Sequence, residues 1–487
     1  MFFSILCANL NAQSNFDFTP EAEVAYDLVL SLQFEAAEEK LAILKKEDPD
    51  NLIPYFIENY IDFFTVFISE DKIAFDRLEG NKDERLQKIK RGDSNSPYYY
   101  YCQAEINLQW ALARLKFEEY FSAFNEVKAA YKLLNKNEKK FPDFIANKKS
   151  LGILHAILGT VPDKYQWGVK LISGMSGSIQ QGKSEIEMIL KHAQNNDFIF
   201  EEESLVMYSF LLLHLNNQQE EAWRIIRSGK LDPSTNPLAC FVLANVAMHT
   251  GRNDEAIELL MNQPKGDQFY DFHYLDYLLG LAKLSRTDED AAIYFKKYLN
   301  QFDGVNYIKE GYQKLAWHEL LNNNPTGYET YIQKCLTEGE AVIGGDKNAL
   351  KEAKKKIIPN SMLLRARILF DGGYYERAYD LLNAFSPSYF EEKRHQLEMN
   401  YRLGRICHKR KHFKEALEYY QDTIEKGHSD GYYFACNAAL QQGLIYESLK
   451  DLEKAERAYR LCLSIKPDEY RSGLHQQAKS GLNRIKE

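Results

Sequence analysis

Proline and glycine are scarce in this sequence, and their scarcity limits the folds that the chain can adopt. There are 13 Pro and 26 Gly among 487 residues, too few for a turn-rich all-β protein but well suited to long helices. Long hydrophobic runs are also missing, since no apolar stretch reaches the ~18–20 residues of a membrane-spanning helix. A basic excess is missing too: the formal net charge is −9, which argues against a general nucleic-acid binder. Hydrophobic residues make up 45% of the chain and aromatic residues 13%, enough for a large core.

Cysteine pairs and catalytic motifs are absent as well. The cysteines form no C-x-x-C pair, and a chain of this length does not need disulfides to fold, so we expect buried free thiols. They are Cys7, Cys102, Cys240, Cys335, Cys407, Cys436 and Cys462. His408 and His412 lie four residues apart, but the three residues between them are cations that would repel a metal ion. Because no G-x-S-x-G and no dinucleotide fingerprint occurs, we expect a protein that is not an enzyme and holds no metal or cofactor.

Residues 1–13 differ from the rest of the chain. They are apolar from Phe2 to Leu10 and end in Asn-Ala-Gln, which resembles the end of a secretory signal peptide, although the basic start of such a peptide is missing. The ending is similar to that of exported Bacteroidota proteins. We therefore expect an exported protein, periplasmic or associated with the outer membrane, where a peripheral association with a membrane complex fits. A cytoplasmic protein with a hydrophobic N-terminus is the alternative.

A repeat is readable near the C-terminus, in NAALQQGLIYESLKDLEKAERAYRLCLSIKPDEY. Counted from Cys436, position 8 is Gly443, position 11 is Tyr446, position 20 is Ala455, position 24 is Tyr459 and position 32 is Pro467. This pattern resembles the tetratricopeptide repeat, a helix–turn–helix unit with small residues at positions 8 and 20. Small residues there allow the two helices to cross closely, large residues fill the space around the crossing, and proline ends the second helix.

Pairs of small residues twelve positions apart recur along the chain. They are Gly404 with Ala416, Ala366 with Ala378, Gly280 with Ala292, Ala244 with Ala256, and Ala25 with Ala37; weaker units pair Phe210 with Ala222 and Ala111 with Ala123. A single hairpin cannot bury its apolar face, so neighbouring hairpins must stack. We predict an all-α, right-handed α-solenoid of some eight hairpins. Its expected parts are an irregular helical region over 14–150 with one repeat-like unit at about 18–50, a central solenoid over 151–345, and a C-terminal array over 346–487.

The segment GSIQQGKS, residues 177–184, matches the phosphate-loop pattern G-x-x-x-x-G-K-[ST]. Such a loop holds phosphates only between a strand and a helix, and no strand-like run precedes it. In the repeat register Gly182 takes position 20, Gly177 takes the turn position that needs a positive φ, and Lys183 and Ser184 fall on the exposed side of the second helix. The same turn position holds Gly251 and Gly373 in other repeats. We expect a repeat hairpin here, with a nucleotide-dependent regulator as the alternative.

The span of about 98–190 resembles a second, narrower group. Its segment LGILHAILGTVPDKYQWGVKLISGMSGSIQQGKSEI is similar to the middle of the inclusion-body-clearance family of repeat proteins. The matching residues are Gly152, Gly159, Pro162, Gly177 and Gly182. The acidic-basic pair usual after the turn glycine is replaced by Ser178-Ile179. The resemblance implies an adaptor-like role and carries no catalytic residues.

Two groups of residues are candidates for binding. Arg367 and Arg405 share position 9 of consecutive repeats, on the helix face that lines the groove of a solenoid, and Arg402 and Lys409 lie close by in sequence. Two such arginines, ~10 Å apart as in packed helices, suit an acidic segment or a free C-terminal carboxylate. The alternative is a solvated helix end whose cations complement its dipole.

The second group is the aromatic run Tyr98–Tyr101, which fits a packed core better than a ligand groove. We expect a non-enzymatic scaffold that binds a protein or peptide on its concave face. A carbohydrate or peptide binder with an aromatic-lined groove is a further alternative.

Overall fold

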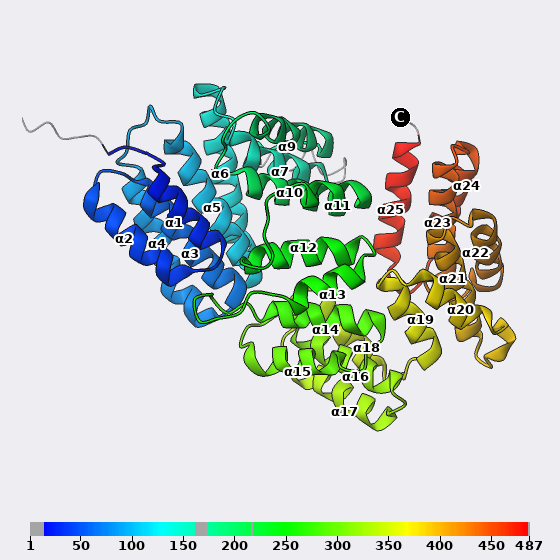
Figure 1. Cartoon of the computed structure of the whole chain (residues 1–487). Helices are drawn as coiled ribbons and strands as arrows, with labels where there is room; N and C mark the ends of the chain where they lie inside the picture. The colour runs from blue at the N-terminus through cyan, green and yellow to red at the C-terminus, as the bar shows by residue number, and fades with distance from the viewer. Residues whose placement is uncertain (1–13, 161–172, 216–217, 486–487) are drawn as a thin grey trace, which may run out of the picture. The chain divides into compact units, whose positions relative to one another are not determined.

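The computed structural model describes residues 14–160, 173–215 and 218–485, and over these residues the protein is all-α (Figure 1). The other regular features in those ranges are a 3-10 turn at Pro387–Tyr389 and a single parallel bridge between Asn15 and Asn51. Within the same described ranges, no helix combines the length and the apolar character needed to cross a membrane. The predicted all-α class is confirmed.

The chain divides into two compact units. Unit 1 comprises Met1–Leu279, Tyr294–Gly311 and Glu338–Asn348, and unit 2 comprises Gly280–Ile293, Tyr312–Thr337 and Ala349–Glu487. The division therefore falls inside four helices, α14 (Tyr274–Arg286), α15 (Ala291–Gln301), α16 (Ile308–Leu321) and α18 (Gly344–Lys355).

The helices of unit 1 pair with their neighbours in sequence as hairpins. The pairs are α1 (Pro20–Leu30) with α2 (Phe34–Glu47), α3 (Ile53–Ser69) with α4 (Lys72–Ile89), α5 (Tyr98–Lys116) with α6 (Tyr120–Lys140), α7 (Asn147–Gly159) with α9 (Ile179–Ala193), α10 (Glu201–His214) with α11 (Gln219–Arg227), and α12 (Pro237–His249) with α13 (Asn253–Met261). Side chains cap several starts: Thr19 accepts the N–H of Ala22, and Asn236, followed by Pro237, accepts the N–H of Ala239. Helices α3 to α6 are longer than the others, so no fixed repeat length marks them in the sequence.

The core of unit 1 is built around α3, which packs on α1, α2, α4 and α5. Its sequence IPYFIENYIDFFTVFI is apolar nearly all round, and Ile53, Phe56 and Ile57 are completely buried. An ion cluster lies inside this core. The Lys149 side chain is fully buried and its Nζ lies 3.0 Å from Glu105 Oε2 and in contact with Glu203.

Unit 2 ends in a regular array of hairpins: α19 (Ser361–Asp371) with α20 (Tyr375–Asn383), α21 (Lys393–Lys409) with α22 (Phe413–Gly427), and α23 (Phe434–Ser448) with α24 (Leu452–Ser464), followed by α25 (Arg471–Arg484). The first helices of the hairpins form one layer, since α21 packs on both α19 and α23, and the second helices lie on the other side (Figure 1). The final helix α25 packs on α23 and α24.

The small residues twelve positions apart occupy the predicted crossings. Every alanine of these pairs is buried: Ala25, Ala37, Ala244, Ala256, Ala292, Ala366, Ala378, Ala416 and Ala455. Gly280 is buried as well. The two glycines at position 8 have a more specific role, because each leaves room for the tyrosine at position 24. A Cβ added to Gly443 would lie 2.4 Å from the Tyr459 ring, and one added to Gly404 would lie 2.7 Å from the Tyr420 ring. Pro467 is buried just after α24 ends at Ser464, while Tyr446 is half-buried.

The stretch between the pairs Gly280–Ala292 and Ala366–Ala378 differs from the prediction. It holds a further hairpin, α16 with α17 (Pro325–Thr337), and a single helix, α18 (Gly344–Lys355), so the eight hairpins expected are too few. The buried residues Cys335, Ala349 and Ala353 join α17 and α18 in one cluster with Tyr312 of α16. This hairpin escaped the spacing rule because Ala316 is followed twelve residues later by Tyr328 instead of a small residue.

Distant segments of unit 1 are tied together by buried carboxylates. Glu70 Oε2 accepts hydrogen bonds from the backbone N–H of Asn306 at 3.0 Å and from its side chain at 2.8 Å. Asp346 accepts the backbone N–H groups of Tyr307 and Glu310 at 2.7 and 2.9 Å, and so caps the start of α16. Burial raises the pKa of Asp346 to about 6, although these two N–H groups act in the opposite direction.

Candidate functional site

The segment 177–184 has a helical structure that leaves no room for a phosphate loop. Ser178 caps α9, which begins at Ile179, and the N–H of Gly182 donates to the carbonyl of Ser178 at 3.0 Å. All residues of the motif from Ile179 onward are therefore helical, so the loop whose N–H groups would wrap around phosphates is not formed. Lys183 is half-buried rather than exposed as predicted, with its Nζ 3.2 Å from Gln218 Oε1 and 3.7 Å from Glu187. Ser184 is exposed.

Both glycines of this motif serve close helix packing. A Cβ on Gly182 would lie 2.2 Å from the carbonyl oxygen of Gly152, and a Cβ on Gly177 would lie 2.4 Å from the backbone of His155. Gly182 is thus a crossing residue as predicted, but its partner helix is α7, so the small residue opposite it is Gly152. The prediction of a positive φ at Gly177 is wrong. Glycine is needed there because the backbone of α7 passes too close for a larger residue. The expected positive φ does occur at two glycines: Gly251 (77°) and Gly373 (85°).

The aromatic run at the start of α5 belongs to the core of unit 1. Tyr101 is fully buried, and its ring lies 5.5 Å from that of Phe144 and 5.4 Å from that of Phe200. The Tyr98 ring lies 5.0 Å from Phe144. Tyr98 and Tyr101 therefore pack inside the protein, as the core interpretation predicted. Tyr99 and Tyr100 are half-buried.

The predicted cations of unit 2 lie on two of the first helices, α19 and α21. We define the cationic face as Arg367 on α19 with Arg394, Arg402, Arg405 and Lys409 on α21. The four α21 residues are spaced to lie along one side of a helix. Two carboxylates, Asp371 and Glu398, share this region. Five cations against two acids leave the face positive in a chain whose net charge is −9.

Arg405 and Arg367 are both held by aromatic rings. The Arg405 guanidinium lies 4.8 Å from the centre of the Phe370 ring and donates to the Tyr401 hydroxyl at 2.9 Å. Arg367 lies 4.9 Å from the centre of the Trp317 ring. Stacking on a ring fixes a guanidinium plane while leaving its edge N–H groups able to bind an anion.

The nearest carboxylate competes only weakly for these arginines. The Arg367 Nε lies 3.7 Å from Asp371 Oδ2, and the two side chains are 43% and 56% exposed, so the pair is solvated and weak. In the described part of the chain, no carboxylate forms an ion pair with Arg405. Arg402 differs from both, because it is bound to Glu398 one turn earlier and both side chains are largely buried.

The charge of the face shows in its titratable groups. Burial opposes ionisation of Glu398, yet Arg402, Arg394 and Arg367 hold its pKa below the ordinary value. Burial, with the charges of Arg405 and Lys409, lowers the pKa of His408 to about 4. Partial burial of the ammonium group and the charge of Arg405 also lower the pKa of Lys409, although part of its side chain stays exposed to solvent. Excess positive charge therefore persists at this end of α21.

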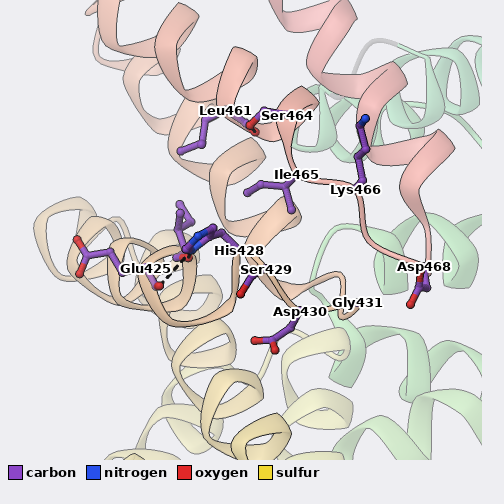
Figure 2. Close-up of a pocket in the computed structure, with 11 residues that line it drawn as sticks. Glu425, His428, Ser429, Asp430, Gly431, Leu461, Ser464, Ile465, Lys466 and Asp468 are labelled. Carbon is purple, nitrogen blue, oxygen red and sulfur yellow. Dashed lines mark hydrogen bonds between the residues drawn. The ribbon is translucent and has the colours of Figure 1, made fainter.

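A cavity of about 890 Å³ lies elsewhere in unit 2, between the ends of α22 and α24 and the loops that follow them (Figure 2). Its walls carry Glu425, His428, Asp430, Lys466 and Asp468. Asp430 is paired with Lys393 at 2.9 Å, and the His428 ring lies 3.2 Å from the Glu425 carbonyl. The mixture of charges favours no single class of ligand.

A smaller cavity of about 400 Å³ is lined by Tyr379, Asn400, Glu415, Glu418, Tyr419 and Asp422. Over the described residues, no group of His, Cys, Asp and Glu side chains could hold a metal ion. His408 and His412 lie in different elements, His408 within α21 and His412 at the N-cap of α22.

The sequence analysis missed the residues that position the two stacked arginines. Phe370 lies three residues after Arg367 on α19 and stacks on Arg405 of the next hairpin, while Trp317 comes from the hairpin that the spacing rule did not find. No signal in the sequence pairs these residues. The Arg402–Glu398 pair was readable, since four residues separate an acid from a following base on a helix.

Part of the chain matches a known repeat family. A model of the tetratricopeptide repeat matches residues 397–425 and 437–469, and no curated protein sequence matches the chain significantly. Among solved structures, the tetratricopeptide-repeat domain of P58(IPK) is 15% identical with a TM-score of 0.22, over 87% of this chain and 97% of that one. The Cut9–Hcn1 hetero-tetramer of APC/C is 12% identical with a TM-score of 0.26, over 96% and 97%. Naa15/Naa10 bound to HypK-THB is 15% identical with a TM-score of 0.25, over 96% and 66%.

These structural likenesses are too distant to indicate a partner. The family match is more specific, because it covers both α21–α22 and α23–α24, the hairpins in which Gly404 and Gly443 make room for a tyrosine ring. The last two helical hairpins of this chain are tetratricopeptide repeats.

Proposed function

We propose that this chain is a non-catalytic scaffold that binds an acidic segment of a protein partner on the cationic face of unit 2. Tetratricopeptide repeats generally serve protein–protein interaction, and stacked repeats present an extended surface of first helices. The acidic segment is the finer part of the proposal, and it comes from the charges of this particular surface.

The observation that carries the proposal is the environment of Arg405. Its guanidinium is stacked on Phe370 and bound to the Tyr401 hydroxyl, without a carboxylate partner among the described residues. Lys409 and Arg367 add charge around it, and the pKa of His408 is lowered to about 4 beside it. An arginine held in place and not neutralised binds a carboxylate with little loss of side-chain entropy.

A change at Asp371 should alter the affinity for an acidic segment in the direction opposite to a change at the arginines. The negative charge of this carboxylate acts on both Arg367 and Arg405, so it competes, although weakly, with a partner acid for them. Removing the carboxylate charge should therefore increase the affinity for an acidic segment, whereas reversing the arginines should abolish it. A site that recognises only apolar features responds to neither change.

The test measures binding of fluorescein-labelled octapeptides of Glu and Asp by fluorescence polarisation at moderate salt. Each charge-assisted contact is worth ~1.5–3 kcal/mol, so Arg367→Glu with Arg405→Glu should weaken binding at least a hundredfold. Asp371→Asn should strengthen it severalfold. An amidated C-terminus on the same peptide tells whether the free carboxylate is recognised or only the acidic side chains.

The matched control is Arg457→Glu with Arg460→Glu on α24, which changes the net charge of unit 2 by the same amount at two exposed sites. It should leave the affinity within about twofold, since distant exposed charges are screened by salt. An equal loss of peptide affinity in both double variants would mean that overall charge, and not the cationic face, governs binding. Unchanged binding after reversal of Arg367 and Arg405 would remove the cationic face from the function.

We also propose that the chain is exported, with residues 1–13 as its signal peptide. Those residues lie outside the described ranges. The support is that the chain is tied into the fold directly after them: Ser14 accepts the N–H of Asp93, and Asn15 is bonded to Asp50 and Leu52. Sequencing of the N-terminus of the protein purified from its own cells tests this, and an intact Met1 would overturn it.

The resemblance to the inclusion-body-clearance family stays a hypothesis, and its Pro162 also lies outside the described residues.

A further inference from the structure

Two cysteines meet inside the last repeat hairpin. Cys436 lies on the first turn of α23 and Cys462 near the end of α24, 26 residues later, and their Sγ atoms are 3.6 Å apart. Both residues are completely buried. The start of one helix of a hairpin lies beside the end of the other, so the pair joins the open end of the hairpin.

Other buried thiols of the described chain have different neighbours. The Cys240 Sγ donates to the carbonyl of Leu259 at 3.4 Å, and the Cys407 Sγ faces a carboxylate oxygen of Glu415 at 3.7 Å. The Cys436 and Cys462 sulfurs, 3.6 Å apart, lie about 1.6 Å beyond the bonded distance of ~2.05 Å. The helices hold them at this separation because Gly443 and Ala455 allow a close crossing further along the same hairpin.

We propose that Cys436 and Cys462 form a disulfide that locks the last tetratricopeptide hairpin, with a small-molecule or protein disulfide as the oxidant. The Cys436 thiol loses its proton and attacks one sulfur of the oxidant, breaking its S–S bond and releasing one thiolate. The Cys462 thiolate then attacks the Cys436 sulfur and releases the second thiolate. Two protein thiols are oxidised to a disulfide, and one external disulfide is reduced to two thiolates, which take up the two protons that Cys436 and Cys462 lose and so become thiols.

The order of attack follows from the contact between the two thiols. Their hydrogen bond lowers the pKa of Cys436 and, together with burial, raises that of Cys462. Because neither sulfur is exposed, the oxidant reaches Cys436 only when the end of the hairpin opens or before it has closed during folding. Once formed, the bond closes a loop of roughly 26 residues, which makes opening of the hairpin about a hundredfold rarer.

This inference is independent of the proposed function, because it depends only on the geometry of α23 and α24. It does bear on where the protein works, since such a bond persists in oxidising compartments and is rare in the cytosol. In an exported chain the locked form is the expected one.

The test incubates the full chain with oxidised glutathione, blocks free thiols after unfolding, and maps disulfides by mass spectrometry. We expect one major linkage, between the peptides holding Cys436 and Cys462, and about a hundredfold slower hydrogen exchange across α23 and α24 that dithiothreitol reverses. Cys436→Ser and Cys462→Ser should each abolish the slowing, while Cys240→Ser should retain it. Low concentrations of urea should speed oxidation by opening the hairpin.

The proposal fails if the two thiols are still fully alkylated after prolonged oxidation in mild urea. It fails equally if glutathione remains attached to Cys436 without transfer to Cys462, or if another cysteine is the main partner. Because either serine variant could perturb folding, circular dichroism of each reduced variant against the reduced parent accompanies the measurement.

Discussion

Gly443→Ala is the sharpest test of how the repeats pack. An added Cβ would lie 2.4 Å from Cε1 and 2.5 Å from Cδ1 of Tyr459, well inside the ~3.5–4.0 Å at which carbon atoms pack. The ring has little room to move, because Gly481 of α25 also packs against it, where an added Cβ would lie 2.5 Å away. The Tyr459 hydroxyl is also bound to Glu447.

The expected size follows from two opposing effects. Overpacking of a closed core typically costs ~1–3 kcal/mol, and the clamped ring puts this site at the upper end. Alanine is favoured over glycine inside a helix by about 1 kcal/mol. The net loss for the last hairpin should be about 2 kcal/mol. Gly80→Ala in the interior of α4, where an added Cβ meets nothing within 4 Å, should instead stabilise its helix by about 1 kcal/mol.

The assay is hydrogen exchange of the amides of α23 to α25, compared with those of α1 and α2, which should not change because repeats interact mainly with their neighbours. Tyr459→Leu removes the ring, so in that background Gly443→Ala should cost far less. The difference between the two backgrounds gives a coupling energy of at least about 1 kcal/mol. The reasoning is refuted if Gly443→Ala costs the same in both backgrounds, or stabilises the hairpin as Gly80→Ala does its helix.

Three further outcomes are expected. Lys149→Met should cost ~3–5 kcal/mol in denaturant unfolding, because it leaves the buried Glu105 and the largely buried Glu203 without a positive counter-charge. Lys148→Met removes the lysine of a partly exposed ion pair and should cost less than about 1 kcal/mol; equal costs would contradict the buried-ion interpretation. The folded pKa of His408 is about 4, below its unfolded value of ~6.5, so the unfolded chain binds the extra proton and stability should fall by up to about 3 kcal/mol from pH 6.5 to 4. A His408→Gln variant should lose that part of the pH dependence of the melting temperature. Calorimetry should show no ATP binding and no effect of Lys183→Ala, whereas Gly182→Val should destabilise unit 1; micromolar ATP binding abolished by Lys183→Ala would restore the nucleotide hypothesis.

The hairpins were readable from the sequence wherever a close crossing needs small residues at a fixed spacing. Ala366 with Ala378 and Gly443 with Ala455 mark such crossings, and all of these positions are buried. The rule fails where a large residue takes the second position, as Tyr328 does after Ala316. The register did not identify Gly152 of α7 as the small residue opposite Gly182, because the two glycines are 30 residues apart and not twelve.

The candidate site was readable only in part. The positions of Arg367 and Arg405 on first helices follow from the register, and their role in binding stays a prediction. Their immobilisation does not follow from it, because Trp317 and Phe370 reach them from neighbouring hairpins, and a single sequence carries no signal of such contacts. Burial of Lys149 was equally hidden, since Lys148 and Lys149 look alike in sequence and only tertiary packing separates them.

The ties within unit 1 set a limit on how this chain can change over evolutionary time. Glu70 binds Asn306, and the N–H of Tyr270 donates to the carbonyl of Leu32 at 2.7 Å. Repeat arrays usually gain or lose length by duplicating or deleting one unit, because each unit touches only its neighbours. Here an added or missing hairpin between residues 70 and 270 would shift the later helices relative to the earlier ones. Both hydrogen-bonded contacts, Glu70 with Asn306 and Leu32 with Tyr270, would then be lost. The number of hairpins in unit 1 should therefore be constant among its homologues.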